Sequence, residues 1–319
     1  MFSLNTSSIL KPKIINPALS RNKPPISVVI VTYKSNRWIG KCLNSLVCNK
    51  VKPSEIIVID NSSPRRPKTI VNKIQKKYQR SCSIRYLENP KNLGFAKAAN
   101  QGAALSKGKY LLFINPDFFI DKSAIKIMTQ FIKTKDNIGA IGGSVLEHKK
   151  RTAQRTVARN PSLLTLIIEF TSFKKIFALF GFKKVSGFWD YRIFDEGLRL
   201  PLAVDAVSGC FMLVKKSVFN QLGGFDENFF LYLEDLDFCI RLKQANFQNF
   251  YLPNATGEHI SGASSILKPH HIDQKSWDKS KRYFVRKQFS FSGEILSCIF
   301  EIDNLLTNFK KRIEGKTYA

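Results

Sequence analysis

Acidic residues are scarce in this sequence. Its 24 Asp and Glu stand against 51 Lys and Arg, which gives a formal net charge of +27. Such an excess attracts phosphate-rich partners, including nucleic acid, anionic lipid and nucleotides, without choosing among them. A nucleic-acid binder usually concentrates its basic residues on one face or arm, whereas here they are spread from Lys11 to Lys316. We therefore expect no nucleic-acid partner.

Closely spaced cysteines and long apolar runs are missing as well. The six cysteines form no C-x-x-C pair, which argues against zinc sites and disulfide frameworks. No segment reaches the roughly 18 uninterrupted apolar residues that span a bilayer. The nearest, Leu163 to Phe182, is interrupted by Glu169 and two lysines. It is either a helix pair packed on the core or a segment that lies on an anionic membrane surface.

A secretory signal is the next missing feature. Residues 1–25 contain basic residues but no continuous apolar core, so we expect them to form a flexible basic tail. Together with the scattered cysteines, this predicts a cytoplasmic protein. The composition is globular, because 44% of the residues are hydrophobic.

Short β-rich runs alternate with helical patterns through the first 133 residues. The β-rich runs cover 26–32, 55–60, 83–87 and 110–114. Apolar residues at helical spacing follow them, over 38–47, 67–78, 95–105 and 123–133. The alternation predicts an α/β fold with a parallel sheet covered on both faces. Asn92 is the expected N-cap of the third helix.

Polar residues close three of the expected strands. Thr32 ends the first, Asp60 ends the second, and Asp117 follows the fourth. Ligands of such sheets collect at the carboxyl ends of the strands, so these side chains are candidate ligand contacts. Each is also of a type that forms turns or caps helices.

Glycine-rich phosphate loops are absent. Neither G-x-G-x-x-G after the first strand nor G-x-x-x-x-G-K-[ST] occurs, so a bound diphosphate would need another holder. A divalent cation bound by carboxylate and imidazole would serve, and Asp117 and His259 are the candidate ligands.

Five carboxylates crowd between Phe225 and Asp237, among aromatic residues and just before a helical pattern that reaches Arg241. Carboxylates held together beside apolar rings repel one another and lose hydration, which raises the pKa of at least one toward values suited to a general base. Asp235 and Glu234 are the candidate catalytic residues. Alternatively, the helix dipole alone favours acidic residues in a first turn. Asp237 and Arg241 stand four apart, which predicts a local ion pair.

Short motifs follow one another from residue 26 to about 265. They are Val-Thr-Tyr at 31–33, Ile-Asp-Asn-Ser-Ser at 59–63, Asn-x-Gly-Phe at 92–95 with Asn100, Asn-Pro-Asp at 115–117, Ser-Gly at 208–209, Gly-Gly-Phe-Asp-Glu at 223–227, Tyr-x-Glu-Asp-x-Asp at 232–237 with Arg241, and His-x-x-Gly-x-Ser at 259–264. This set resembles the family 2 inverting glycosyltransferases with a GT-A fold, in particular the bacterial rhamnosyltransferase-like branch.

The resemblance implies a mostly parallel, doubly wound sheet. The GT-A domain would cover residues 26–265, with a Rossmann-like nucleotide-sugar-binding half over 26–120 and an acceptor and catalytic half over 121–265. A basic, aromatic helical tail would follow over 266–319.

The resemblance also implies roles for single residues. Six would contact the nucleotide: Thr32, Tyr33, Asp60, Asn92, Gly94 and Asn100. Asp117 matches the closing Asp of the family's metal-binding D-x-D, with Asn115 in place of the opening Asp. His259 would be a further ligand, and the cofactor would be Mg²⁺ or Mn²⁺.

The implied reaction is a single displacement that inverts the anomeric carbon. Asp235 would be the base, with Glu234 in support. Asp205 and Gly209 would contact a sugar, the alternative for Asp205 being a turn residue. The donor would be a nucleoside-diphosphate sugar, with dTDP-rhamnose the first choice and a UDP- or GDP-sugar the alternative. The acceptor would be a saccharide or a polyprenyl-diphosphate-linked saccharide of a surface polysaccharide, handled at the inner face of the cytoplasmic membrane.

Two other functions fit parts of the sequence. A sugar nucleotidyltransferase would normally have a glycine-rich basic loop after the first strand, where this chain has Tyr33-Lys34-Ser35-Asn36-Arg37. A non-catalytic polyanion binder is suggested by the net charge alone, and it leaves the acidic cluster unexplained.

Overall fold

A computed structural model describes residues 26–62, 67–148, 154, 156–171, 192–193, 200–260 and 271–313. The expected tail over 1–25 and most of 172–199 lie outside these ranges. The elements are β1 (Ile26–Thr32), α1 (Ile39–Val47), β2 (Glu55–Asp60), α2 (Pro67–Tyr78), β3 (Ser83–Glu88), α3 (Phe95–Leu105), β4 (Tyr110–Ile114), β5 (Phe118–Ile120), α4 (Ala124–Phe131), β6 (Ile138–Glu147), β7 (Val157–Ala158), α5 (Leu163–Phe170), β8 (Arg192–Ile193), β9 (Leu202–Val204), β10 (Ala206–Val207), β11 (Phe211–Lys215), α8 (Lys216–Gln221), α9 (Glu234–Gln244), β12 (Gln248–His259) and α10 (His271–Ile313).

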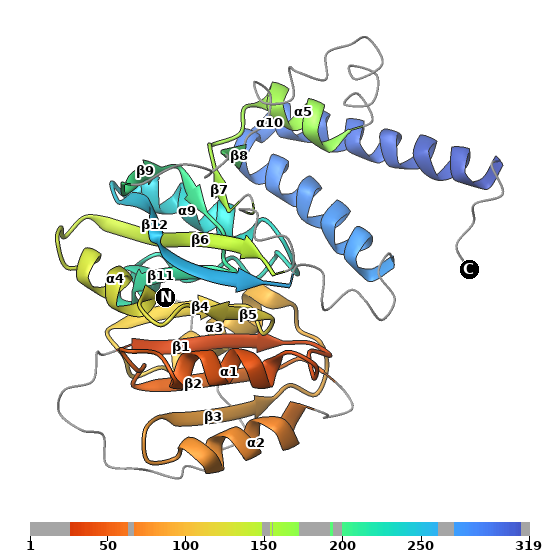
Figure 1. The fold of residues 1–319 in the computed structure, drawn as a ribbon. Helices are drawn as coiled ribbons and strands as arrows, with labels where there is room; N and C mark the ends of the chain where they lie inside the picture. The colour runs from red at the N-terminus through yellow and green to blue at the C-terminus, as the bar shows by residue number, and fades with distance from the viewer. Residues whose placement is uncertain are drawn as a thin grey trace.

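The predicted α/β alternation is confirmed through α4, with helix and strand ends that differ by two residues or fewer. Nine strands form one sheet in the order β3-β2-β1-β4-β11-β6-β12-β5, and β9 pairs with β12. Figure 1 shows β3, β2, β1 and β4 stacked upward from the bottom, with β6 and β12 above them. The first four strands are parallel, as expected, whereas β11 runs antiparallel to both β4 and β6.

The core lies on both faces of this sheet, because neighbouring residues of a strand point to opposite sides. On β1, Val28 and Ile30 join an apolar cluster with α1, α2 and α4. Val29, between them, joins a second cluster with α3, α8, α9 and α10. The expected covering of both faces is therefore confirmed.

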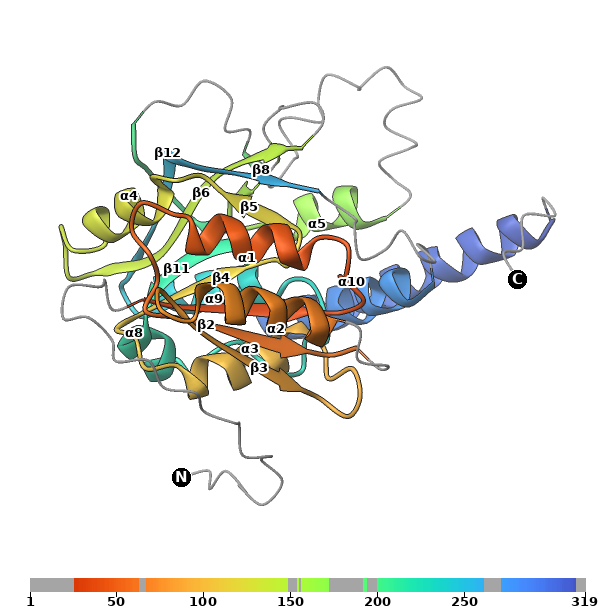
Figure 2. The same ribbon diagram turned by 60° about the horizontal axis from the view of Figure 1, so that its bottom comes forward.

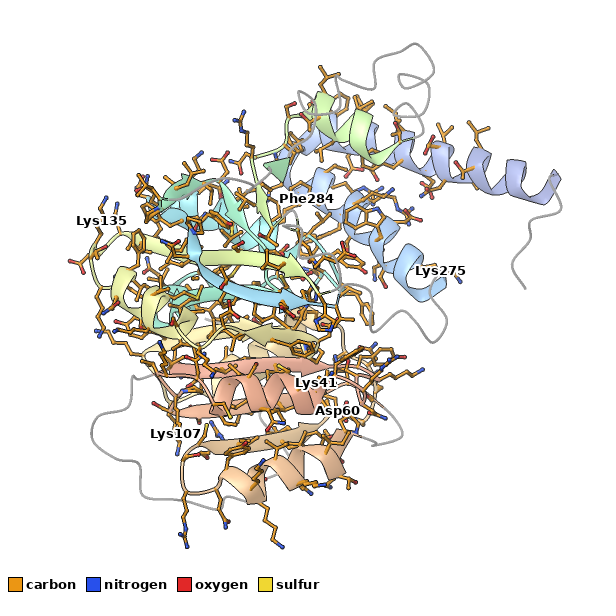
Figure 3. The ribbon with its side chains drawn as sticks, viewed as in Figure 1. Lys41, Asp60, Lys107, Lys135, Lys275 and Phe284 are labelled. Carbon is orange, nitrogen blue, oxygen red and sulfur yellow. The ribbon has the colours of Figure 1, made fainter. Side chains whose placement is uncertain are left out.

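The long C-terminal element α10 is a pair of helices. Ser290 interrupts it with φ 48° and ψ −126°. The first half packs on the second apolar cluster, where Phe284 is fully buried (Figure 3). The second half extends beyond the other described elements (Figures 1 and 2). No helix within the described ranges is long and apolar enough to cross a bilayer.

A buried ion cluster fastens the first half of α10 to α9. Asp237 is fully buried and receives Arg241 Nε at 2.8 Å, Lys287 Nζ at 2.7 Å and Gln288 Nε2 at 3.0 Å. The predicted pair of Asp237 with Arg241 is thus confirmed. Lys287 Nζ also contacts Asp226 Oδ2 at 2.6 Å, so one ammonium group bridges two carboxylates.

This cluster predicts an acid-dependent loss of stability. Partial burial acts to raise the pKa of Asp226, but hydrogen bonds from Lys287, Asn228 and Tyr283 outweigh it and lower that pKa to about 2. The folded-state pKa lies below the unfolded value of about 3.9, so the stabilisation is complete above the unfolded value and is lost as the pH falls toward the folded one. We expect Asp226→Asn to be less stable than the wild type at neutral pH and to lose less stability on acidification.

Urea unfolding at a series of pH values measures both effects. The control is Glu227→Gln, because that neighbouring carboxylate is half exposed. If the free energy of unfolding falls equally steeply with decreasing pH in Asp226→Asn and in the wild type, the lowered pKa of Asp226 is contradicted.

Candidate active site

The ends of β1 and β2 place two predicted residues side by side. Thr32 and Asp60 are partners in the parallel register, and both are fully buried. Asp60 accepts hydrogen bonds from the backbone N–H of Ser62 at 2.8 Å and from the hydroxyl of Tyr86. The Thr32 hydroxyl has no hydrogen-bond partner among the described residues, so it is free to bind a ligand at this edge of the sheet. Tyr33 follows, half-buried.

This edge faces the same side of the molecule as the start of α10. Figure 3 shows Asp60 and Lys275 on that side, with Lys107 and Lys135 at the opposite ends of the strands. The ligand edge expected from the strand order is thus the edge beside α10.

The turn before α3 corrects one prediction. Asn92 is not the N-cap of α3, because Gly94 holds that position. Asn92 Oδ1 instead accepts a hydrogen bond from the Gly94 N–H at 3.0 Å. Gly94 has φ 85°, and a Cβ there would lie 2.4 Å from the carbonyl oxygen of Phe230. Only glycine allows the two chains to approach this closely. The Phe95 N–H donates a hydrogen bond to the same Phe230 oxygen at 2.7 Å.

Asn100 joins α3 to the loop that precedes α9 and contains Phe225 and Glu227. Its side chain accepts from the Phe225 N–H at 3.0 Å and donates to the Phe225 carbonyl at 2.8 Å. It also donates to Glu227 Oε1 at 3.1 Å. These bonds give Asn100 a structural role, and its contact with a nucleotide stays a prediction.

Asp117 and His259 meet although 142 residues separate them. β5 and β12 pair antiparallel with His259 opposite Phe118, which sets the imidazole beside the preceding Asp117. His259 Nε2 lies 3.2 Å from Asp117 Oδ1 and 3.3 Å from the side-chain amide of Asn115. Gln154 Oε1 contacts the other ring nitrogen at 3.1 Å. A carboxylate, an imidazole and an amide therefore converge, as the motif positions predicted.

Asp235, the second residue of α9, lines a pocket of about 290 Å³. Its Oδ2 accepts a hydrogen bond from the Gly209 N–H at 2.7 Å, and its Oδ1 accepts from the Leu236 N–H at 2.8 Å. A Cβ at Gly209 would lie 3.3 Å from that of Asp235, so the two chains pass close to each other. Five predicted residues line the pocket: Asn115, Gly209, Glu234, Asp235 and His259.

Glu234, next to Asp235, is 5% exposed, and its Oε2 has no hydrogen-bond partner among the described residues. Burial, and then the charge of Asp235, raise the pKa of Glu234 well above its ordinary value. The expectation that one carboxylate of the cluster has a raised pKa is therefore met at Glu234. A buried acid that keeps its proton is a hydrogen-bond donor as well as an acceptor.

The backbone before these carboxylates is strained. Tyr232 and Leu233 have φ values of 72° and 68°, in the left-handed region that non-glycine residues rarely occupy. Such a conformation persists only where its surroundings hold it. Here the Phe230 carbonyl is bound to α3, and the Leu231 carbonyl accepts the Ser280 hydroxyl of α10 at 2.7 Å.

Some predicted residues lie elsewhere, and some pocket residues were missed. Asp205 does not line the pocket; it binds Lys243 Nζ at 2.6 Å and the Asn160 N–H at 3.0 Å. Sequence patterns gave no signal for Thr156, whose buried hydroxyl is unpartnered among the described residues, or for Trp277 of α10. The Trp277 ring lies 5.6 Å from that of Tyr232.

Comparison with known proteins identifies the family of this chain. Residues 27–223 match the sequence model of the family described as "Glycosyl transferase family 2", and residues 192–262 match the one described as "N-terminal domain of galactosyltransferase". The rhamnosyltransferase WbbL of Escherichia coli K12 is 24% identical over 273 residues, which is 83% of this chain and 92% of that protein.

A second rhamnosyltransferase and one solved structure also match this chain. The N-acetylglucosaminyl-diphospho-decaprenol L-rhamnosyltransferase of Mycobacterium tuberculosis H37Rv is 26% identical over 263 residues, 76% of this chain and 78% of that one. Among solved structures, the mannosyltransferase PcManGT of Pyrobaculum calidifontis superposes with a TM-score of 0.54 at 13% identity, over 86% of this chain and 66% of that one. This likeness confirms the GT-A fold.

The raised pKa of Glu234 predicts a pH-dependent cost in stability. The unfolded chain releases this proton above about pH 4.5, whereas the folded protein keeps it to a higher pH. Stability therefore falls as the pH rises from the unfolded pKa toward the folded one. Glu234→Gln retains the shape of the neutral acid, so its stability relative to the wild type should rise over the same range.

Urea unfolding of both proteins at mildly acidic and mildly alkaline pH tests this. The free energy of unfolding of Glu227→Gln, at a half-exposed carboxylate of the same loop, should differ from that of the wild type by the same amount at every pH. If the free energy of unfolding of Glu234→Gln relative to the wild type stays constant or falls with rising pH, the raised pKa of Glu234 is contradicted.

Proposed function

We infer the reaction of this protein from its family. The chain belongs to glycosyl transferase family 2 and is therefore a glycosyltransferase. We propose that it moves a sugar from a nucleoside diphosphate to a hydroxyl group with inversion at the anomeric carbon. The observation that carries the proposal is the Asp235 carboxylate, anchored at 2.7 Å by the Gly209 N–H in the same pocket as Asn115 and His259.

Asp235 is the proposed base. Its carboxylate takes the proton of an acceptor hydroxyl while that oxygen forms a bond to the anomeric carbon. The bond from that carbon to the diphosphate oxygen breaks in the same step, and the electron pair leaves with the nucleoside diphosphate. The hydrogen bonds from Gly209 and Leu236 hold the carboxylate in one orientation. Protonated Glu234 is proposed to donate a hydrogen bond to a sugar oxygen beside it.

The residues around His259 suit a divalent cation. The solved mannosyltransferase holds Mn²⁺ with GDP-Man. The described part of this chain contains no group of three His, Cys, Asp or Glu that could hold a metal ion alone. Asp117 and His259, with Asn115, would hold such a cation in the presence of a diphosphate. When bound, it supplies positive charge to the departing diphosphate.

Donor and acceptor are proposed from the relatives. The E. coli and mycobacterial relatives are named as rhamnosyltransferases, which favours dTDP-rhamnose as donor. The mycobacterial name also includes a decaprenol-linked sugar, which favours a lipid-linked saccharide as acceptor in this protein. The buried, unpartnered hydroxyl of Thr32 beside Asp60 is the proposed contact for the nucleobase or ribose.

Nucleotide binding is the first test. We expect one of dTDP, UDP or GDP to raise the melting temperature in the presence of Mg²⁺ or Mn²⁺, since a ligand at about 100 times its Kd adds about 2.7 kcal/mol of stability. Asp117→Ala should lose the metal-dependent part of the shift. Asp136→Ala is the matched control, because that carboxylate is fully exposed at the start of β6. If none of these nucleotides shifts the wild type, the proposed donor class is wrong.

The base is tested separately with the nucleotide identified in this way. We expect Asp235→Asn to lower sugar transfer by about 10²- to 10⁴-fold, the usual contribution of a general base. Its nucleotide-dependent melting shift should persist. Glu227→Gln removes a carboxylate of the same acidic cluster and should leave transfer unchanged. Substantial activity in Asp235→Asn would rule out its role as base.

A further inference from the structure

The second half of α10 exposes a row of large apolar side chains. Five of the seven large hydrophobic residues that are exposed in the described part of the chain belong to it. They form what we call the α10 stripe: Phe291, Ile295, Ile302, Leu305 and Leu306, each between 51% and 78% exposed. Positions i, i+4, i+11, i+14 and i+15 fall on one side of a helix. A contiguous apolar row of this kind marks an interaction site.

The opposite side of the same helix is already packed. Leu296 and Phe300 are 2% and 1% exposed and belong to the apolar cluster that includes Leu166 of α5 and Phe284. The helix therefore has two apolar sides, and only one of them is needed to hold it on the protein. The second half of α10 itself extends beyond the sheet and the helices that cover it (Figures 1 and 2).

Two of the acidic residues in the second half of α10 are paired with arginines of its first half. Glu294 is paired with Arg286 at 2.9 Å, and Glu301 is paired with Arg282 at 3.0 Å. Over the whole of α10 nine Lys and Arg stand against five Asp and Glu, and its last residues include the basic run Lys310-Lys311-Arg312. The helix thus combines an apolar side with an excess of positive charge.

Charge decides between the two simplest occupants. A second copy of this chain would place another α10, which also has more Lys and Arg than Asp and Glu, against the same helix, and this opposes association. An anionic bilayer attracts that charge and accepts a helix whose apolar side lies in its surface. The sequence offered 163–182 as another candidate for membrane contact; among its described residues Leu166 is buried, whereas Leu164 is half exposed.

We propose that the second half of α10 docks the protein on an anionic lipid surface through the α10 stripe, lying in the plane of the membrane without crossing it. The first half of the same element supplies Trp277 to the pocket, so docking also brings the pocket near the membrane. The docking itself does not depend on the proposed reaction. Its benefit, access to a lipid-linked acceptor, does.

Vesicle flotation of the full chain tests the proposal. Wild-type protein should float with vesicles of equimolar phosphatidylethanolamine and phosphatidylglycerol and should bind vesicles of phosphatidylcholine more weakly. The double variant Ile302→Glu, Leu305→Glu should bind the anionic vesicles at least about tenfold more weakly, because two charges enter the apolar side. Ser292→Glu is the matched control, since Ser292 is exposed on the same helix outside the stripe. It should bind like the wild type.

Two readouts keep failure of the proposal distinct from other failures. The melting temperature and its nucleotide-dependent shift, measured without lipid, report folding and the donor site of each variant, and both should be unchanged in the double variant. Equal flotation of wild type and double variant would overturn the proposal, because basic residues elsewhere would then suffice. Absence of wild-type flotation would overturn it too, as would light scattering that shows a dimer which the double variant dissociates.

Discussion

The fully buried carboxylate of Asp237 is the constraint on which the arrangement of α9 and α10 depends. A charge in that position is tolerable only when it is paired and hydrogen-bonded, and removing one partner of such a group costs several kcal/mol. Arg241 pairs with it from the next turn of α9 and also donates to the carbonyls of Leu222 and Gly224. Lys287 and Gln288 reach it from α10. The loop before α9, α9 itself and the C-terminal helix are therefore joined at one carboxylate.

That junction explains how a strained turn persists beside the pocket. Two consecutive left-handed residues, Tyr232 and Leu233, would relax in an isolated segment. Contacts from α3 hold Phe230, and Ser280 of α10 holds Leu231, so the turn is fixed from two sides. The result is that Glu234 and Asp235 start α9 at the pocket wall, one buried and with a raised pKa, the other with its carboxylate held by backbone N–H groups.

Local sequence patterns predicted those features that depend on residues close together in the chain, and they missed those that depend on distant ones. The elements from β1 to α4 were predictable because strand and helix periodicities are local, and the pair of Asp237 with Arg241 was predictable because it lies within one helical turn. The meeting of Asp117 and His259 depends on the pairing of β5 with β12, which no local pattern encodes; only motif order indicated it. Trp277 enters the pocket from a helix that begins after the sheet is complete. The cap at Asn92 was wrong because the close approach of Phe230 requires glycine at position 94.

Gly293 has a consequence for the geometry of any surface-bound state. A Cβ at this position would lie 2.0 Å from the carbonyl oxygen of Val285, so the two halves of α10 touch backbone to backbone just after the break at Ser290. The ion pairs of Arg286 with Glu294 and of Arg282 with Glu301 add further connections across the same angle. The second half is thus connected to the first half at several points beyond the break. If the second half lies on a membrane, these connections set the distance between the pocket and the lipid surface. That distance would then determine how long a lipid-linked acceptor must be to reach Asp235.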